Sequence, residues 1–316
     1  MSRAPVEHEM STRTLARLPS GERVATKVHR YVGGDGPTVY IQAAQHGIEL
    51  NGPAALYRLH DRLVDAELAG TVIAVPVANP LAFDARTYIT PSAYDAREPN
   101  MNRSWPGDES GTLGARIVAS LWELASNADA VVDLHTGTAD MLSHVRHQEG
   151  AEGAREMARQ FGTGYRLLDD RGHSGSSPTA EFRTTATSAD IPAITVELGN
   201  SRSVSRHRAD AGTEGLLRVL AGLAVRQGEA DPPKTQTALR GSPAVVMADA
   251  SGLFEPTERA AVGVEIAAGE PVGEIYDPAS FESLGAPTAE DGGVVYSIRK
   301  GTVMAGERVA ALGAII

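Results

Sequence analysis

The chain has 316 residues, of which 42% are hydrophobic and 22% charged, a composition typical of a globular protein of about two domains. It contains no cysteine, which excludes disulfides, thiolate metal sites, iron–sulfur clusters and a thiol nucleophile. The formal net charge of −11 argues against a nucleic-acid or anionic-membrane partner, because both are bound through clustered Lys and Arg.

The first segment, residues 1–21, is polar and is predicted to be an N-terminal arm. It lacks the apolar stretch of an export signal, and no apolar run in the chain approaches the roughly 18 residues of a transmembrane helix. We therefore expect a cytoplasmic protein.

Residues 22–229 carry the alternation of strands and helices that is typical of an α/β domain. After a strand-rich entry segment, apolar runs predict strands at 38–44, 71–77, 130–134 and 193–196. Helical periodicity lies between them, at 53–68, 113–125, 151–161 and 211–225. This pattern predicts a mixed sheet sandwiched by helices.

The pattern changes near residue 229. Residues 230–240 contain consecutive prolines and are predicted to be a linker. From 241 to 316, short β-type runs are separated by Gly and Pro, and no long helix is evident. We expect a small C-terminal all-β domain, close to the size at which a domain can just sustain its own core.

Ionisable residues follow three of the predicted strands. His46 and Glu49 come after the first, His135 after the third and Glu197 after the fourth. Because loops at the carboxyl ends of parallel strands converge on one crevice, these four residues are expected to share a site. Two His and one Glu form an established ligand set for catalytic zinc, with one position left for water. Glu197 would be free to accept a proton from that water, whose pKa zinc lowers to about 7.

Other candidate residues are less specific. His60 lies in the first predicted helix, and His144 with His147 lies in a predicted polar loop, so we interpret them as residues that bind no metal. Ser174 does not fit a nucleophile elbow, because no strand precedes it and residue 176 is not glycine. Arg86 and Arg103 lie in consecutive loops near the predicted metal and could bind an anionic substrate group or an oxyanion.

Five motifs in order resemble the succinylglutamate desuccinylase/aspartoacylase family, a branch of the zinc carboxypeptidase clan. They are His46-Gly47-Ile48-Glu49, Asn79-Pro80-Leu81-Ala82 followed by Arg86, Asn102-Arg103, Asp133-Leu134-His135-Thr136-Gly137 and Val196-Glu197-Leu198-Gly199. The resemblance extends over roughly residues 38–200 and implies a zinc carboxypeptidase-like fold, with a C-terminal β domain that partly covers the cleft.

The resemblance also implies roles for individual residues. One Zn²⁺ per chain would be held by the predicted His, Glu and His ligands, and Glu197 would act as general base and proton shuttle. Arg86 would polarise the scissile carbonyl, while Asn102 and Arg103 would bind the substrate carboxylate. Asp133 and Asn100 would stand behind the metal ligands.

Two features depart from the family pattern. Many relatives carry an Asp where this chain has Asn100, and an amide in that place leaves the His it supports slightly less basic. The loop 88–99 is also long, so the acyl group of the substrate does not follow from any one relative.

We therefore expect a zinc-dependent amidohydrolase that removes the acyl group from an N-acyl amino acid. The segment Asn100-Met101-Asn102-Arg103-Ser104-Trp105-Pro106-Gly107 looks most like the acetyl-diaminobutyrate type of deacylase. The partner would be this small molecule, and a homo-oligomer is possible. The alternatives are a zinc carboxypeptidase acting on short peptides and a metal-lacking pseudoenzyme used for binding.

Overall fold

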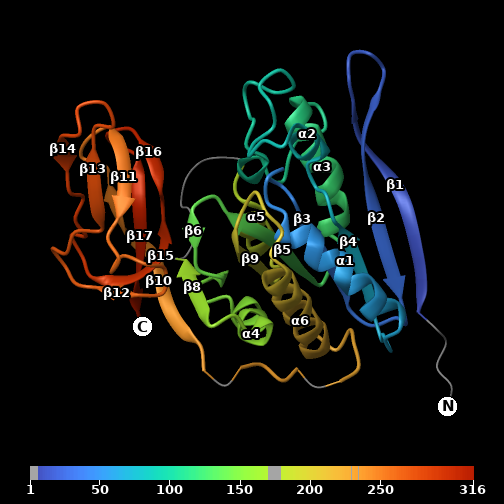
Figure 1. Ribbon diagram of the computed structural model, residues 1–316. Helices are drawn as coiled ribbons and strands as arrows, with labels where there is room; N and C mark the ends of the chain where they lie inside the picture. Colours follow the sequence, from blue (N-terminus) through green and yellow to red (C-terminus); the bar gives the residue numbers. More distant parts are fainter. Residues whose placement is uncertain (1–5, 170–178, 229, 234) are drawn as a thin grey trace.

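The computed structural model describes residues 6–169, 179–228, 230–233 and 235–316. Within them a 13-stranded mixed sheet is flanked by helices, and a four-stranded sheet lies in the C-terminal part (Figure 1). The strands are β1 (Glu7–Arg17), β2 (Arg23–Val32), β3 (Thr38–Ala43), β4 (Thr71–Val75), β5 (Ala130–Gly137), β6 (Asp140–Met141), β7 (His144–Gln148), β8 (Tyr165–Asp169), β9 (Ala193–Asn200), β10 (Thr237–Met247), β11 (Gly252–Pro256), β12 (Glu265–Ile266), β13 (Gly273–Tyr276), β14 (Ser283–Gly285), β15 (Gly293–Ile298), β16 (Gly301–Val303) and β17 (Arg308–Ile315). The helices are α1 (Asn51–Val64), α2 (Pro80–Ala85), the 3₁₀ turn η1 (Met101–Arg103), α3 (Leu113–Ala125), α4 (Glu152–Phe161), α5 (Phe182–Ser188) and α6 (Arg206–Gly222). None of the described helices is long and apolar enough to cross a membrane.

The large sheet has the strand order β1-β2-β4-β3-β5-β9-β7-β8-β10-β17-β15-β12, with β6 paired to β15. Its centre, β4-β3-β5-β9, is parallel, whereas β2 and β7 run antiparallel to their central neighbours. The central strands are buried on both faces, which explains their nearly continuous apolar sequences.

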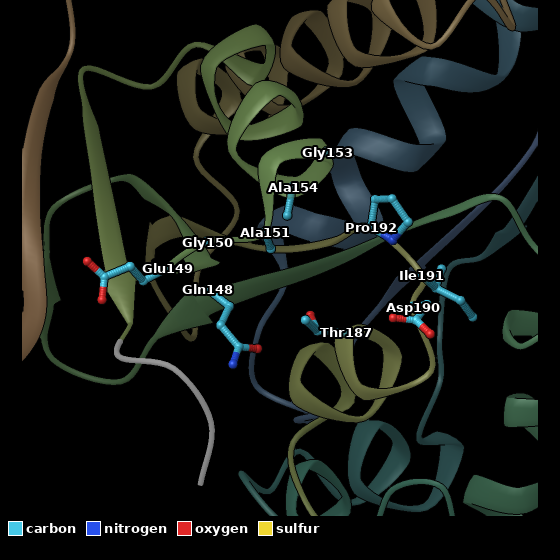
Figure 2. A pocket seen from close by; sticks show the side chains of 10 residues that line it. All are labelled: Gln148, Glu149, Gly150, Ala151, Gly153, Ala154, Thr187, Asp190, Ile191 and Pro192. Atoms are coloured by element: carbon cyan, nitrogen blue, oxygen red, sulfur yellow. The ribbon is translucent and has the colours of Figure 1, made fainter.

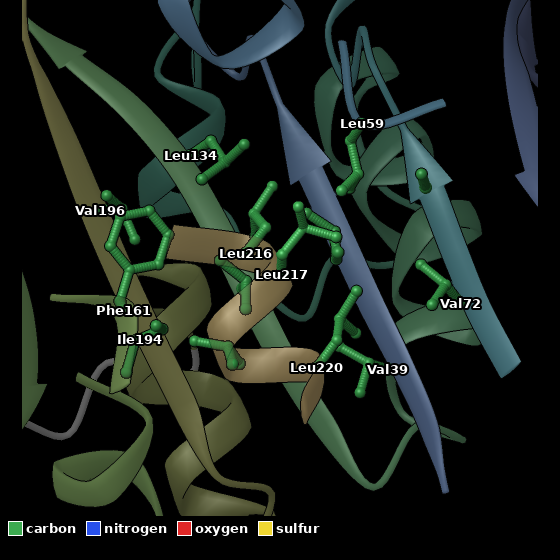
Figure 3. Close-up of a cluster of buried hydrophobic side chains, with 14 of the residues drawn as sticks. Val39, Leu59, Val72, Leu134, Phe161, Ile194, Val196, Leu216, Leu217 and Leu220 are labelled. Carbon is green, nitrogen blue, oxygen red and sulfur yellow. The ribbon is translucent and has the colours of Figure 1, made fainter. Parts of the chain in front are cut away.

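Helices cover both faces of this sheet, as the alternating pattern predicts. On one face, α1, α4 and α6 pack Leu59, Phe161 and Leu216 against the strands, as Figure 3 shows. On the other face, α3 and α5 contribute Leu121 and Phe182 to a second core. Helix α3 begins after Thr112, whose side chain accepts a hydrogen bond from the backbone N–H of Ala115, a standard N-cap.

The N-terminal segment differs from the arm predicted for residues 1–21. Residues Glu7–Arg17 form β1, which pairs antiparallel with β2 along its whole length and is the outer strand of the sheet. Most of its side chains are exposed, and Leu15 is buried. A strand held mainly by backbone hydrogen bonds to its neighbour has no apolar alternation, so composition alone does not reveal it.

The C-terminal part is all β, but its strands are not confined to a separate sheet. β10 pairs in parallel with β8, and β17 and β15 continue the large sheet beyond it. Residues 237–240, predicted as linker, therefore belong to the sheet, because their hydrogen-bond partners lie about 70 residues earlier in the chain. The four-stranded sheet β14-β13-β11-β16 shares a core with β15 and β17, built around residues such as Phe254 and Val295.

Candidate metal centre

The four strand-end residues predicted to share a site do lie together. β3, β5 and β9 are parallel neighbours, and His135 on β5 is paired in register with Glu197 on β9. His46 and Glu49 lie in the short loop that joins β3 to α1. The carboxyl ends of adjacent parallel strands thus position all four residues, as the topological argument requires.

Two imidazoles and one carboxylate form the centre. His46 Nδ1 lies 2.9 Å from Glu49 Oε1, and His135 Nδ1 lies 2.9 Å from Glu49 Oε2. One potential ligand atom from each residue lies within 4.8 Å of the others, and all three residues are buried. This group could hold a metal ion.

The second ring nitrogen of each histidine, Nε2, also has a hydrogen-bond partner. His135 Nε2 donates to Asp133 Oδ2 at 2.8 Å, and this carboxylate also accepts from Gln45 Nε2, whose amide oxygen accepts from Trp105 Nε1. His46 Nε2 lies 3.2 Å from Asn100 Oδ1. The structure thus places Asp133 and Asn100 behind the two imidazoles.

The hydrogen bonds of the two imidazoles show whether a cation would fit between their Nδ1 atoms and the Glu49 carboxylate. An imidazole that donates through Nε2 presents the lone pair of Nδ1, and both Nδ1 atoms face the same carboxylate. Lone pairs directed at a carboxylate repel it unless a proton or a metal ion lies between them. Nitrogen and oxygen donors in this number, with hydrogen-bonded partners behind the rings, match a catalytic metal site.

The two carboxyl groups of the centre have opposite pKa shifts. Burial alone would raise the pKa of Glu49, but the neighbouring His46 and His135 outweigh it and hold the pKa at about 2. Burial raises the pKa of Glu197 to about 7, with Glu49 adding to the rise and His135 opposing it. Glu197 Oε2 is buried without a hydrogen-bond partner among the described residues. The centre therefore holds one firmly ionised carboxylate and one carboxyl poised to exchange a proton near neutral pH.

The backbone of the loop explains why glycine lies between the ligands. A Cβ at Gly47 would lie 2.0 Å from the carbonyl oxygen of Ala82, at the start of α2, so only glycine permits this approach. Ala44, two residues before His46, has a φ of 53°, in the left-handed region that alanine rarely adopts. Such conformations persist where the surrounding structure holds a functional loop in place.

A family model described as the succinylglutamate desuccinylase/aspartoacylase catalytic domain matches residues 35–223, which include every residue of this centre. The chain belongs to this family. It is 28% identical over 255 residues to the N-alpha-acetyl-L-2,4-diaminobutyric acid deacetylase of Halomonas elongata, covering 77% of this chain and 72% of that protein.

Solved structures of similar proteins extend the likeness to the whole chain. A succinylglutamate desuccinylase/aspartoacylase from Rhodobacter sphaeroides superposes with a TM-score of 0.85 at 26% identity, covering 99% of this chain and 97% of the other. The ectoine utilization protein EutE (DoeB) of Ruegeria pomeroyi superposes with a TM-score of 0.83 at 23% identity, covering 99% and 96%. The second likeness concerns the fold alone.

Arg86, predicted as a catalytic residue, and Asn102 and Arg103, predicted to bind substrate, lie in different surroundings. Arg86 ends α2 with a φ of 54°, and its exposed side chain makes no hydrogen bond or ion pair with the described residues. Asn102 is buried; its Oδ1 accepts from the backbone N–H of Phe182, and its Nδ2 lies 3.5 Å from His135 Nε2. Arg103 is largely exposed and pairs with Glu181 at 3.2 Å. Arg86 and Arg103 therefore present charge to solvent, whereas the amide of Asn102 is partly used within the protein.

Several residues of the centre were missed by the sequence pattern. Tyr88 stacks on His46 with ring centroids 4.0 Å apart. The prediction of a polar loop at His144 and His147 was wrong: both are buried on β7, where His144 is paired with Glu197 in register. His144 also contacts the ring of Tyr296 on β15, so the C-terminal β strands reach the neighbourhood of the centre. β7 is too short and too polar to show the alternation of apolar and polar residues by which a strand is recognised in a sequence.

A hollow in the surface lies away from this centre. It is lined by residues that include Gln148, Thr187 and Pro192 (Figure 2). β7 runs antiparallel to β9, so Gln148 lies beside the amino end of β9, at the end of this strand opposite the candidate metal centre. The hollow is therefore not part of the centre. Ser174 lies outside the described residues.

Proposed function

We propose that this protein is a zinc-dependent hydrolase that removes the acyl group from an N-acyl amino acid. The observation that carries the proposal is the buried set His46, Glu49 and His135. Glu197 lies on the neighbouring strand, and its buried Oε2 has no hydrogen-bond partner among the described residues. Family membership supports the same reaction class.

One Zn²⁺ per chain would be held by the two imidazoles and the carboxylate, which is a zinc carboxypeptidase-like arrangement of ligands. When bound, zinc supplies Lewis acidity, which polarises a carbonyl and lowers the pKa of water to about 7. The aromatic ring of Tyr88 packs on His46 and restricts the imidazole to the orientation that faces Glu49.

Glu197 would move the protons of the reaction. Hydrolysis of an amide adds water across the C–N bond, so a proton must leave the water and another must reach the nitrogen of the leaving amine. Burial raises the pKa of this carboxyl in the metal-free protein, and a carboxyl beside the metal can accept the first proton and return it to the amine. Its Oε2 makes no competing hydrogen bond among the described residues.

The roles proposed for Arg86, Asn102 and Arg103 suit an amino-acid substrate. Arg86 would stabilise the oxyanion that develops on the scissile carbonyl, and Arg103 with Asn102 would bind the substrate carboxylate. The 28% identity with the Halomonas elongata deacetylase favours N-acetyl-2,4-diaminobutyrate or a close analogue as substrate. An exposed Arg103 can exchange its ion pair with Glu181 for one with the incoming carboxylate.

The test is a deacylation screen with zinc supplied. N-acetyl, N-succinyl and N-formyl amino acids, including N-acetyl-2,4-diaminobutyrate, are assayed beside short peptides, with release of the free amine as readout. We expect turnover of at least one N-acyl amino acid and its loss on chelation. Turnover confined to peptides would assign a peptidase instead, and bound zinc without turnover of either class would overturn the proposed hydrolase.

A further inference from the structure

Three further histidines, from segments far apart in the chain, meet at the outer edge of the sheet. His8 is on β1, His29 on β2 and His60 on α1. In the antiparallel pair, His8 is opposite Tyr31, so His8, His29 and Tyr31 share one face of the two strands, and Tyr31 shares a core with Leu59 of α1. One ring nitrogen from each histidine lies within 4.8 Å of the others, and all three residues are half-buried.

We propose that His8, His29 and His60 form a second metal site, for a divalent transition-metal ion of the zinc, nickel or copper kind. Imidazole is a preferred ligand for these ions. His60 lies nine residues beyond Asn51, the first residue of α1, which is about 13 Å along the helix axis, whereas Glu49 lies in the loop before the helix. The site is thus separate from the candidate metal centre.

The distance between two of the rings fits a bound ion. His8 Nε2 lies 3.2 Å from His29 Nδ1. Two imidazole nitrogens on one tetrahedral ion, each bonded at about 2.0–2.1 Å, would be separated by roughly 3.3 Å. The ring nitrogen of His60 lies at most 4.8 Å from those of His8 and His29. It therefore needs to move towards them by at most about 1.5 Å to reach the separation of roughly 3.3 Å, and a side-chain rotation of His60 can supply this movement.

Tyr31 orients the third ring. Its hydroxyl oxygen lies 2.8 Å from His60 Nδ1. If Nδ1–H donates to the hydroxyl, Nε2 presents its lone pair, which is how ligand imidazoles are commonly held by a hydrogen-bond partner. The Tyr31 ring also stacks on His8, with centroids 4.6 Å apart. Tyr31 is therefore a positioning residue for two of the three ligands.

Metal binding would replace a contact between two of the rings. His8 Nε2 and His29 Nδ1 share one hydrogen bond, and a metal ion would take the place of its proton, because each ligand imidazole must present a free lone pair. A bound ion would clamp the edge strand β1 to β2 and α1.

The test measures zinc stoichiometry in the full chain after removal of all metal and dialysis against Zn²⁺. We expect two zinc ions per chain in the wild type and one in His29→Gln and His60→Gln, with deacylase activity retained. His207→Gln, which changes an exposed histidine outside both groups, is the matched control and should keep two. His135→Ala should also bind one, but at the other site. If the wild type binds one zinc ion and His135→Ala binds none, the second site is overturned and the catalytic centre stands. If the wild type binds one zinc ion and His29→Gln binds none, the catalytic centre is overturned and the second site stands.

Affinity and melting temperature give readouts that do not depend on activity. Tyr31→Phe keeps all three imidazoles and should weaken zinc binding at this site by about 10- to 100-fold. Saturating zinc should raise the melting temperature of the wild type by about 5 °C more than that of His60→Gln. The melting temperatures of the two metal-free proteins should agree, which shows that the variant folds. An equal zinc-induced rise in both proteins would overturn the site.

Discussion

Replacing Glu197 by glutamine should make the metal-free protein more stable while abolishing most of its turnover. The pKa of this carboxyl is raised from 4.5 to about 7, chiefly by burial. The folded state therefore retains a proton that the unfolded chain releases between pH 4.5 and 7, so the contribution of Glu197 to stability is lost as pH rises through this window. A rise in the pKa from 4.5 to about 7 corresponds to about 3 kcal/mol at pH 8.

Glutamine has the same shape and no charge, so the stability of the variant should not fall as the pH rises through this window. The free energy of unfolding is measured by urea titration of metal-free wild type and Glu197→Gln, in chelator, at pH 4.5 and pH 8. We expect nearly equal stabilities at pH 4.5 and a variant more stable by about 3 kcal/mol at pH 8. Glu265→Gln, at an exposed position on β12, is the control and should show no such difference.

The same variant separates the metal site from proton transfer. Zinc-loaded Glu197→Gln should keep its zinc, because the three proposed ligands are intact, and lose about 10²- to 10⁴-fold in kcat. A variant that keeps substantial turnover, or whose stability relative to wild type does not depend on pH, would refute the role assigned to this buried carboxyl.

Three further substitutions test the ligands and their supports. Gly47→Ala places a Cβ 2.0 Å from the Ala82 carbonyl oxygen and should lower the free energy of unfolding by at least about 2 kcal/mol; an unchanged urea midpoint would contradict the close approach. Asn100→Asp puts a carboxylate behind His46 and should tighten zinc binding about tenfold in a competition titration with a chelator, whereas weaker binding would count against that contact. His135→Ala should lose the zinc of the catalytic centre together with turnover, and an unchanged zinc content on elemental analysis would refute the ligand set.

The sequence by itself determined the central sheet and the residues that meet at its edge. His46, Glu49, His135 and Glu197 follow strands whose apolar runs are long enough to recognise, and the rule for parallel sheets places the ends of such strands together. The helix predicted at 113–125 has the bounds of α3, because its apolar periodicity extends over the whole element.

Only the tertiary structure decided the features that depend on pairing between distant segments. The polar strand β1 pairs with β2, and β10, whose first residues were predicted to be linker, pairs with β8. The local sequence of β1 or β10 does not reveal its partner. His60 had the pattern of an ordinary helix residue until the fold set it beside His8 and His29. Local patterns report burial and periodicity, whereas contacts across 20 to 80 residues depend on strand order and register, which no short segment encodes.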